Sequence, residues 1–256
     1  MKTIIFLSDE GLVDELGWRL PFPLIPIGGN TIIGHTLDLF ESYLGDEISI
    51  ISPDVEVAAW LFEQYPDLSI SCVKSWGDVG AMDGELLVIN GRFLTNPNLP
   101  DDLPANAAIT DENGKVTALW MKKGSSPTAD IENWMDKMGA DATAFPARFS
   151  YPVRTIAELQ HANTRMLGLG YGSDDLVERS YAEEFMGLPP VFLGETAVVD
   201  HSIIGPYAHI GANAHIKSSI IRNSIISAGA IIENCILDGA IIGENIKIIG
   251  EGQAII

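Results

Sequence analysis

Short apolar runs alternate with helix-spaced apolar positions over the first third of the chain. Helical spacing covers Thr31–Tyr43 and Val55–Gln64, and a buried strand is expected from each β-branched apolar run. The expected strands are Thr3–Leu7, Glu47–Ser52, Leu68–Val73 and Leu86–Asn90. Strands and helices that alternate at these intervals predict an α/β fold, in which helices cover the faces of a mostly parallel sheet.

The middle of the chain predicts a hairpin and two more helices. The turn sequence Asp111–Gly114 lies between two extended segments of Ile109–Met121, which indicates a β-hairpin. Ile131–Met138 and Thr155–Leu167 are expected to be helical. Thr155 is a candidate N-cap of the second helix, and a glutamate three residues further on completes a capping-box pattern.

The pattern changes after Pro190, where aliphatic residues recur at steps of five or six. Every third one is Leu193, Ile210, Ile226 or Ile242, at separations of 17, 16 and 16 residues. Such a period is typical of a parallel β-helix, in which each triangular coil has three short strands. About four coils fit into the segment. The glycine-rich and proline-rich stretches before it predict a boundary between a domain of residues 1–188 and one of residues 189–256.

Paired aliphatic residues in the repeat segment predict self-association. Neighbouring side chains on a strand point to opposite faces, so one of each pair is expected outside the coil. The expected outward residues are Ile203, Ile225, Ile231, Ile241 and Ile249. Exposed apolar surface on this scale usually marks an interface. The last coil, ending at Ile255 and Ile256, is also expected to need cover. The chain is therefore predicted to form a homo-oligomer through the repeat segment.

Composition narrows the classes of partner and the location. The formal net charge of −20 repels nucleic acid and anionic membranes, so neither is an expected partner. No apolar run is long enough to span a membrane, and the first residues do not form a signal peptide. Cys72 and Cys235 are far apart and fit buried thiols in a reducing compartment. These features predict a cytoplasmic protein.

Four segments, in order, resemble the sugar-phosphate nucleotidyltransferases, also called NDP-sugar pyrophosphorylases. Arg19–Ile33 resembles the family segment R-L followed by P-K-P-L-L-P, and Leu87–Arg92 resembles the strand that ends in N-G-D. Thr110–Leu119 resembles the hairpin D-E-x-G-R-V. Tyr151–Leu159 with the pair at 162–163 resembles W-x-D-[IV]-G-T-P-E-D-L followed by A-N. The resemblance implies a shortened nucleotidyltransferase-like (Rossmann-like) mostly parallel sheet, followed by a left-handed parallel β-helix.

The family joins a sugar 1-phosphate to a nucleoside triphosphate and releases pyrophosphate. This reaction needs a glycine-rich loop of N–H donors, a cation beside the phosphates and carboxylates that hold a divalent metal. In this chain the loop is replaced by Ser8–Gly11, which contains Asp9 and Glu10. The family lysine falls on Phe22, and the two metal-binding aspartates fall on Arg92 and Pro152, which do not ligate Mg²⁺. The family's sugar-binding insert is largely absent between these last two positions.

These losses predict a nucleotidyltransferase homologue without useful catalysis, acting as a binding, regulatory or assembly subunit in nucleotide-sugar metabolism. A nucleotide or sugar nucleotide is the expected ligand. The candidate ligand-binding residues are Ser8, Gly11, Arg19, Asn90, Gly91 and Arg92. Arg19 and Arg92 can each hold an anion or form a structural ion pair. No metal site and no cofactor are expected.

Two alternatives stay open. In the first, the chain is an active nucleotidyltransferase with a rearranged site, in which Mg²⁺ is required and Asp78 or Asp83 holds it. In the second, it is a hexapeptide-repeat acyltransferase. Enzymes of that class use a histidine as general base, and the repeat segment contains His201, His209 and His215. His35 and His161 lie on expected helices and are assigned structural roles.

Overall fold

The chain forms two compact units. The computed structural model describes residues 1–7, 12, 20–52, 54–80, 84–123, 130–171 and 185–250. The first unit contains most of the described chain up to Val153. The second unit begins at Arg154 and also takes in the earlier segment Ile25–Thr31. The domain boundary expected between residues 188 and 189 stays a prediction.

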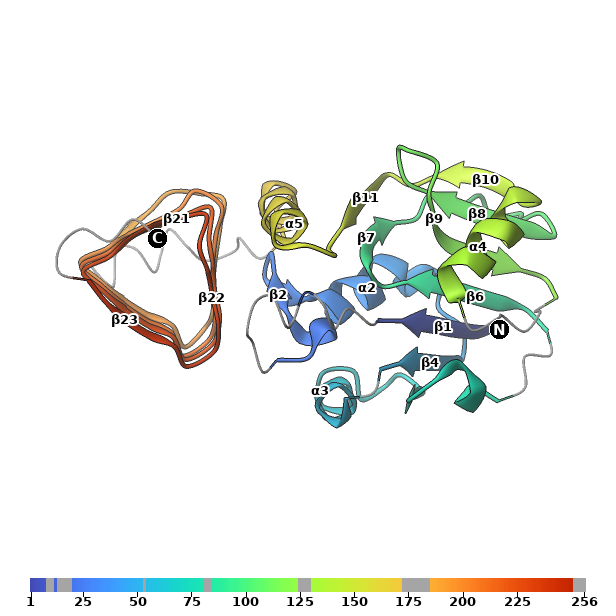
Figure 1. Ribbon diagram of the computed structural model, residues 1–256, viewed down its shortest axis with the longest axis horizontal. Helices are drawn as coiled ribbons and strands as arrows, with labels where there is room; N and C mark the ends of the chain where they lie inside the picture. Colours follow the sequence, from blue (N-terminus) through green and yellow to red (C-terminus); the bar gives the residue numbers. More distant parts are fainter. Residues whose placement is uncertain are drawn as a thin grey trace. The chain divides into compact units, whose positions relative to one another are not determined.

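A seven-stranded sheet is the centre of the first unit (Figure 1). Its order is β10-β8-β9-β6-β1-β4-β5. The strands are β1 (Lys2–Phe6), β4 (Glu47–Ile51), β5 (Ile70–Val73), β6 (Leu86–Asn90), β8 (Asn106–Thr110), β9 (Val116–Met121) and β10 (Thr143–Pro146). Pairings among β6, β1, β4 and β5 are parallel, as is the pairing of β10 with β8, whereas β9 runs antiparallel to both neighbours. The mostly parallel sheet and the β8–β9 hairpin were both predicted and are confirmed.

Three helices of the first unit lie where the sequence predicted helices. They are α2 (Ile32–Phe40), α3 (Val55–Gln64) and α4 (Ile131–Ala140). Short 3₁₀ helices are η1 (Phe22–Leu24), η2 (Glu41–Tyr43) and η3 (Trp76–Asp78). Trp134 and Met135 of α4 pack into a buried cluster with Ile4, Val88 and Leu119 of the sheet. Burial of such side chains contributes about 1.5–3 kcal/mol each and holds the helix on the sheet.

In the first unit, two strands outside the main sheet were not predicted. These are β7 (Phe93–Asn96) and β11 (Phe149–Pro152), which form an antiparallel pair. Thr95 and Ser150 link the two strands through a hydroxyl–hydroxyl hydrogen bond of 2.9 Å. The pair brings Pro152 opposite Phe93, directly after the N-G-D-like segment.

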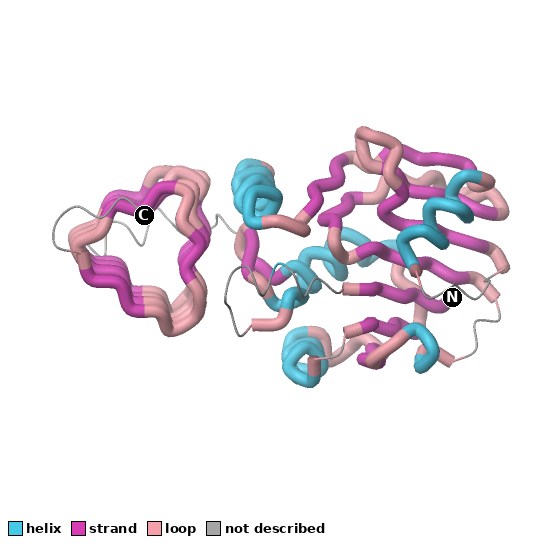
Figure 2. The backbone as a smooth tube through the Cα atoms, in the orientation of Figure 1, coloured by secondary structure: helices cyan, strands magenta, loops and turns pink. Residues whose placement is uncertain are grey.

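The second unit contains a stack of short parallel strands, the C-terminal stack, which is drawn end-on in Figures 1 and 2. Its strands are β12 (Met186–Gly187), β13 (Val191–Leu193), β14 (Val198–Asp200), β15 (Ile203–Ile204), β16 (Ala208–Ile210), β17 (His215–Lys217), β18 (Ile220–Arg222), β19 (Ile225–Ile226), β20 (Ile231–Glu233), β21 (Ile236–Asp238), β22 (Ile241–Ile242) and β23 (Lys247–Ile249). Every third strand pairs in parallel, which gives three four-stranded sheets that face one another as a triangle. The arrangement is compatible with a parallel β-helix.

Aliphatic ladders fill the inside of the stack. Leu193, Ile210, Ile226 and Ile242 are consecutive partners in one sheet, so the stacking predicted from their spacing is confirmed. The other two sheets contribute equivalent ladders to the same buried cluster. Because aliphatic residues occupy equivalent positions on successive levels, each level fills the interior with side chains of similar shape.

Asparagines in the left-handed backbone region turn several corners of the stack. Asn213, Asn223, Asn234 and Asn245 have φ values of 57°, 49°, 56° and 57°. Asparagine tolerates this region because its short polar side chain bonds locally, whereas a β-branched residue there is strained. The corners therefore explain why asparagine recurs between the isoleucines.

Helix α5 (Ile156–Gly168) and the hairpin of β2 (Pro26–Ile27) and β3 (Asn30–Thr31) complete the second unit. Thr155 caps α5 as predicted, because its hydroxyl accepts the Glu158 N–H at 3.2 Å. The glutamate carboxylate, however, accepts from the N–H of Arg154 rather than of the cap residue.

Two amides of α5 join it to the C-terminal stack. Gln160 donates to the Gly239 carbonyl and Asn163 to the Tyr207 carbonyl, on different levels of the stack. Ile225 is the strand partner of His209, to which Gly29 of the hairpin bonds. Its side chain is completely buried. The expectation that Ile225 would be exposed is wrong, because α5 and the hairpin lie against this side. Ile249 is exposed as expected, and Ile203, Ile231 and Ile241 are half-buried.

Candidate functional site

The order of the parallel strands reverses between β1 and β6. After β1 the chain builds β4 and β5 on one side and then crosses to place β6 on the other. In open α/β sheets, ligands bind beyond the carboxyl ends of the strands at such a reversal. Here the two strand ends meet at Phe6 and Asn90, and the Gly91 N–H donates to the Phe6 carbonyl at 2.9 Å. The segment singled out by sequence therefore lies where the topology places a ligand.

Gly91 allows the two strand ends to approach closely. A Cβ atom at this position would overlap the Leu7 side chain and would come within 3.0 Å of the Phe6 carbonyl oxygen. Glycine is needed here because of this contact.

Arg92 forms an ion pair inside the candidate site. One of its guanidinium nitrogens lies 3.1 Å from Oε1 of Glu132. The Asn90 side-chain amide donates to the same oxygen at 3.2 Å, and its carbonyl oxygen accepts the Arg92 N–H at 3.1 Å. The Arg92 and Glu132 side chains are about 28% and 31% exposed. The three residues make a closed network at the end of β6.

Glu132 was not found by sequence reasoning. It lies in the first turn of α4, where acidic residues are common because they complement the helix dipole. Asp130 caps the same helix by accepting the Asn133 N–H at 3.0 Å. In the sequence, Glu132 is marked only as an acidic residue two positions after the N-cap Asp130. This position does not indicate that its side chain contacts Arg92, 40 residues earlier in the chain.

The two positions where the family pattern has metal-binding aspartates are brought together. The Val153 N–H donates to the Arg92 carbonyl at 3.0 Å, and Pro152 is paired with the residue after Arg92. Positions 92 and 152 are therefore close neighbours in the structure. Among the described residues, no group of three or more histidine, cysteine, aspartate or glutamate side chains is placed to hold a metal ion.

Other residues singled out by sequence are not part of this network. Phe22 is a buried residue of η1. Asp78 closes its own turn, since its carboxylate accepts from the N–H and the hydroxyl of Ser75 at 3.1 and 2.8 Å. The remaining candidates lie outside the described residues, and they are Ser8, Asp9, Glu10, Gly11, Arg19 and Asp83. That Asp9 and Glu10 put negative charge where the phosphates of a ligand would lie stays a prediction.

The three histidines of the C-terminal stack have different surroundings. His209 is buried, its ring lies 4.7 Å from that of Phe192, and its Nδ1 accepts the Gly29 N–H at 3.2 Å. His201 contacts the carboxylate of Asp200 at an exposed corner. His215 is exposed on β17. The structure does not bring these histidines together.

The two remaining histidines lie on helices as predicted. His35 is buried in α2 and His161 lies on α5. Both cysteines are free thiols. Cys235 is buried, Cys72 is half-buried, and burial raises the pKa of the Cys72 thiol, which disfavours a reactive thiolate.

Neither a scan against protein-family models nor a search of curated proteins finds a match for this chain.

In the part of the chain that the structure describes, none of the helices combines the length and the apolar character needed to cross a membrane.

Proposed function

We propose that the chain is a sugar-phosphate nucleotidyltransferase homologue with a left-handed C-terminal β-helix, and that it acts as a binding, regulatory or assembly subunit in nucleotide-sugar metabolism. The N-G-D-like segment at the strand reversal and the stacked C-terminal strands support this assignment. The four family-like segments along the chain support it as well. The Rossmann-like character of the first unit is part of the same proposal.

The Arg92–Glu132 ion pair carries the argument against catalysis. At the position of a metal-binding carboxylate the chain has a cation, and that cation is neutralised by a carboxylate of its own protein. A Mg²⁺ ion needs oxygen ligands and would be repelled by the guanidinium. The second position offers only a proline ring. The donor set therefore does not suit the metal-assisted reaction.

The expected loss of rate is large. Removal of one strong electrostatic contact to a transition state costs about 2.7–4 kcal/mol, or a factor of about 10²–10³ in rate. Contacts that act as a unit are not additive, so the residual rate is expected to be close to background rather than a product of separate factors.

Binding of a nucleotide or sugar nucleotide does not need the full catalytic set. Arg92 lies at the reversal point with its side chain about 28% exposed, whereas the Asn90 amide and the Gly91 N–H are engaged in the hydrogen bonds described above. A phosphate could compete with Glu132 for Arg92, because both are anions that suit a guanidinium. Such binding would not depend on Mg²⁺.

The acyltransferase alternative is not favoured by the surroundings of His209. A general base needs its ring nitrogen within hydrogen-bond reach of the acceptor proton. The Nδ1 of His209 instead accepts a backbone N–H in a partly buried hydrogen bond. His201 contacts the carboxylate of Asp200, and His215 is exposed on β17.

A pyrophosphate-release assay tests the proposal. The full chain is incubated with Mg²⁺ and each common pair of nucleoside triphosphate and sugar 1-phosphate. The expected result is background release that Arg92→Ala leaves unchanged. Turnover near ~1 s⁻¹ with any pair lies within the usual enzyme range and would establish the active alternative.

Calorimetric titration tests the binding role. The probes are the same nucleoside triphosphates and their sugar nucleotides, with and without Mg²⁺. Binding is expected to be independent of Mg²⁺ and to weaken at least tenfold in Arg92→Ala, because one charge-assisted contact contributes about 1.5–3 kcal/mol. Arg154→Ala is the matched control, since this arginine bonds to Glu158 on α5. If none of these nucleotides binds, the proposed binding role is wrong and the assembly role is tested next.

The assembly role rests on one side of the C-terminal stack. Met186, Ile203, Ile220 and Ile236 are consecutive outward partners in the sheet of β12, β15, β18 and β21. Met186 is 56% exposed and the three isoleucines are half-buried. The row carries no charge in a chain of net charge −20, so a second copy can approach there without bringing like charges of the row together. We therefore assign this row to a contact between two copies of the chain.

A further inference from the structure

A pocket lies in the first unit, at the opposite end of β6 from Arg92. Its volume is about 350 Å³. It is lined at the start of β6 by Glu85 and Leu87 and at the end of β9 by Trp120 and Lys122. Leu87 and Trp120 are direct neighbours in the β6–β9 pairing, so their side chains share one face of the sheet. The sheet thus supplies a rigid floor.

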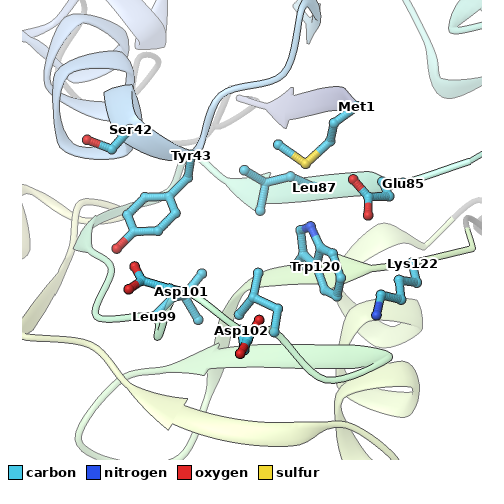
Figure 3. A pocket seen from close by; sticks show the side chains of 11 residues that line it. Met1, Ser42, Tyr43, Glu85, Leu87, Leu99, Asp101, Asp102, Trp120 and Lys122 are labelled. Carbon is cyan, nitrogen blue, oxygen red and sulfur yellow. The ribbon is translucent and has the colours of Figure 1, made fainter.

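The floor and one wall of the pocket are apolar or aromatic. Figure 3 shows Leu87 and Trp120 in the middle of the pocket, with Tyr43 of η2 and Leu99 on one side. Trp120 is only 6% exposed, so its ring is held by the surrounding core. A floor of this kind can cover the apolar body of a small molecule without rearrangement.

The rim of the pocket is strongly acidic. Three exposed carboxylates line it, from Glu85, Asp101 and Asp102, against the single ammonium group of Lys122. In the described part of the chain, none of these four side chains takes part in an ion pair. Glu85 and Asp101 lie on opposite sides of Trp120 in Figure 3. A bound cation would therefore meet negative charge from two directions.

We propose that this pocket binds a small organic cation, with a primary ammonium or guanidinium group on an apolar or aromatic body. The body covers Leu87, Leu99 and Trp120, and the charged group faces the carboxylates of the rim. Anionic molecules such as nucleotides are disfavoured by the same charges. The pocket therefore serves a ligand different from that of the strand reversal, and it does not depend on the nucleotidyltransferase assignment.

The cationic group in the pocket could belong to a free amine or to a lysine side chain of another protein. Its volume suits a free small molecule, since pockets of about 300–1,000 Å³ bury most of such a ligand. A titration distinguishes the two sources. The first probe is phenethylammonium, and the second is a blocked Gly-Lys-Gly peptide. Tighter binding of the first probe is expected, and tighter binding of the peptide would overturn the assignment to a free amine.

Matched neutral and anionic probes test the role of charge. Titrations of the full chain use phenethylammonium, phenethyl alcohol and 3-phenylpropionate, followed by calorimetry and by the amide and indole N–H signals of Trp120. The alcohol is expected to bind at least tenfold more weakly than the ammonium compound, and the carboxylate is not expected to bind. Equal binding of ammonium compound and alcohol, or no binding of either, would overturn the proposal.

Variants at the rim test the place of binding. The double variant D101N/D102N keeps side-chain shape and is expected to weaken phenethylammonium binding about tenfold, because two charge contacts with the bound ammonium group are lost together. Glu112→Gln, in the exposed hairpin turn between β8 and β9, is the matched control and should bind like the unchanged chain. Unaltered binding in the double variant would place the cation elsewhere. Since both changes are at exposed positions, folding is checked by an unchanged circular dichroism spectrum.

Discussion

Single polar residues hold distant parts of the second unit together. Asn163 accepts the Gly28 N–H at 3.0 Å and donates to the Tyr207 carbonyl at 3.3 Å. A Cβ at Gly28 would lie 2.5 Å from Cβ of Met166, and its φ is 50°, so this turn requires glycine. Asn163 was noted in the sequence only as part of a family-like motif. Its role could not be predicted, because its partner lies 135 positions away in the chain.

The contact of His209 with Gly29 predicts a structural effect at the residue scale. His209→Phe keeps a ring against Phe192 but leaves a backbone N–H without its acceptor. An unsatisfied buried donor costs about 1–3 kcal/mol, so the urea unfolding midpoint should fall and the Gly29 amide should exchange faster with deuterium. His215→Phe, at an exposed position of the same stack, is the control and should change the free energy by less than about 0.5 kcal/mol. Equal effects of the two substitutions would contradict the assigned contact.

Elements with a clear apolar period were predictable, and those without it were not. The predicted bounds of α3 and β6 agree with the structure, because each element has an unbroken pattern between turn residues. β7 and β11 are four residues long and end near a proline, so neither shows a period. They become strands only because they pair with each other. Short strands depend on their partner more than on their own sequence.

The first turn of α5 predicts a pH-dependent contribution to stability. Partial burial by itself would raise the pKa of Glu158, but hydrogen bonds from the side chain and backbone of Arg154, the charge of Arg154 and the backbone of Thr155 outweigh it and lower the pKa below its usual value. A carboxyl with a lowered folded-state pKa stabilises the protein above its unfolded pKa of about 4.3, and the contribution is lost as the pH falls through the folded value.

Glu158→Gln measures this contribution. The substitution should cost about 0.5 kcal/mol at pH 7, because the Arg154 contact is partly exposed and screened by solvent. The difference from the unchanged chain should shrink as the pH falls below about 4.3. Urea unfolding at pH 7 and at pH 3 gives the two values. A cost that does not depend on pH would show that the charge is not involved.

At the scale of the whole molecule, the repeat and the sheet were predictable but the convergence of residues was not. The spacing of Leu193, Ile210, Ile226 and Ile242 predicted their stacking, since a period constrains every level at once. The order of strands around β1 and the meeting of Arg92 with Glu132 depend on crossovers between distant segments. The side of the stack that buries Ile225 likewise depends on α5. Such contacts are set by tertiary packing, which a single sequence does not display.

Association of two copies through the row of Met186, Ile203, Ile220 and Ile236 predicts a dependence of the oligomer on salt. A chain of net charge −20 repels its own copies, and added salt screens that repulsion. Sedimentation at micromolar concentration should therefore show an oligomer that becomes more stable between low and moderate ionic strength. Ile220→Glu, which puts a charge into the row, should give a monomer with an unchanged circular dichroism spectrum.

Val198→Glu is the matched control for this experiment. Val198 is 49% exposed and lies on a different sheet of the stack. It adds the same charge and should leave the oligomer intact. A monomeric unchanged chain, or equal dissociation by both variants, would contradict the assignment of the row.

In the C-terminal stack, stacked partners are separated by a nearly constant number of residues, so the stack is built of equivalent levels. From Ile210 to Ile226 and on to Ile242 each level adds 16 residues and repeats the level below it. Duplication or loss of one such segment in a gene would keep every inner ladder in register, because each level touches only its two neighbours. The chain can thus change length in whole steps during evolution without a new core. A single inserted residue between two isoleucines, by contrast, would turn the inward side chains of that strand outward.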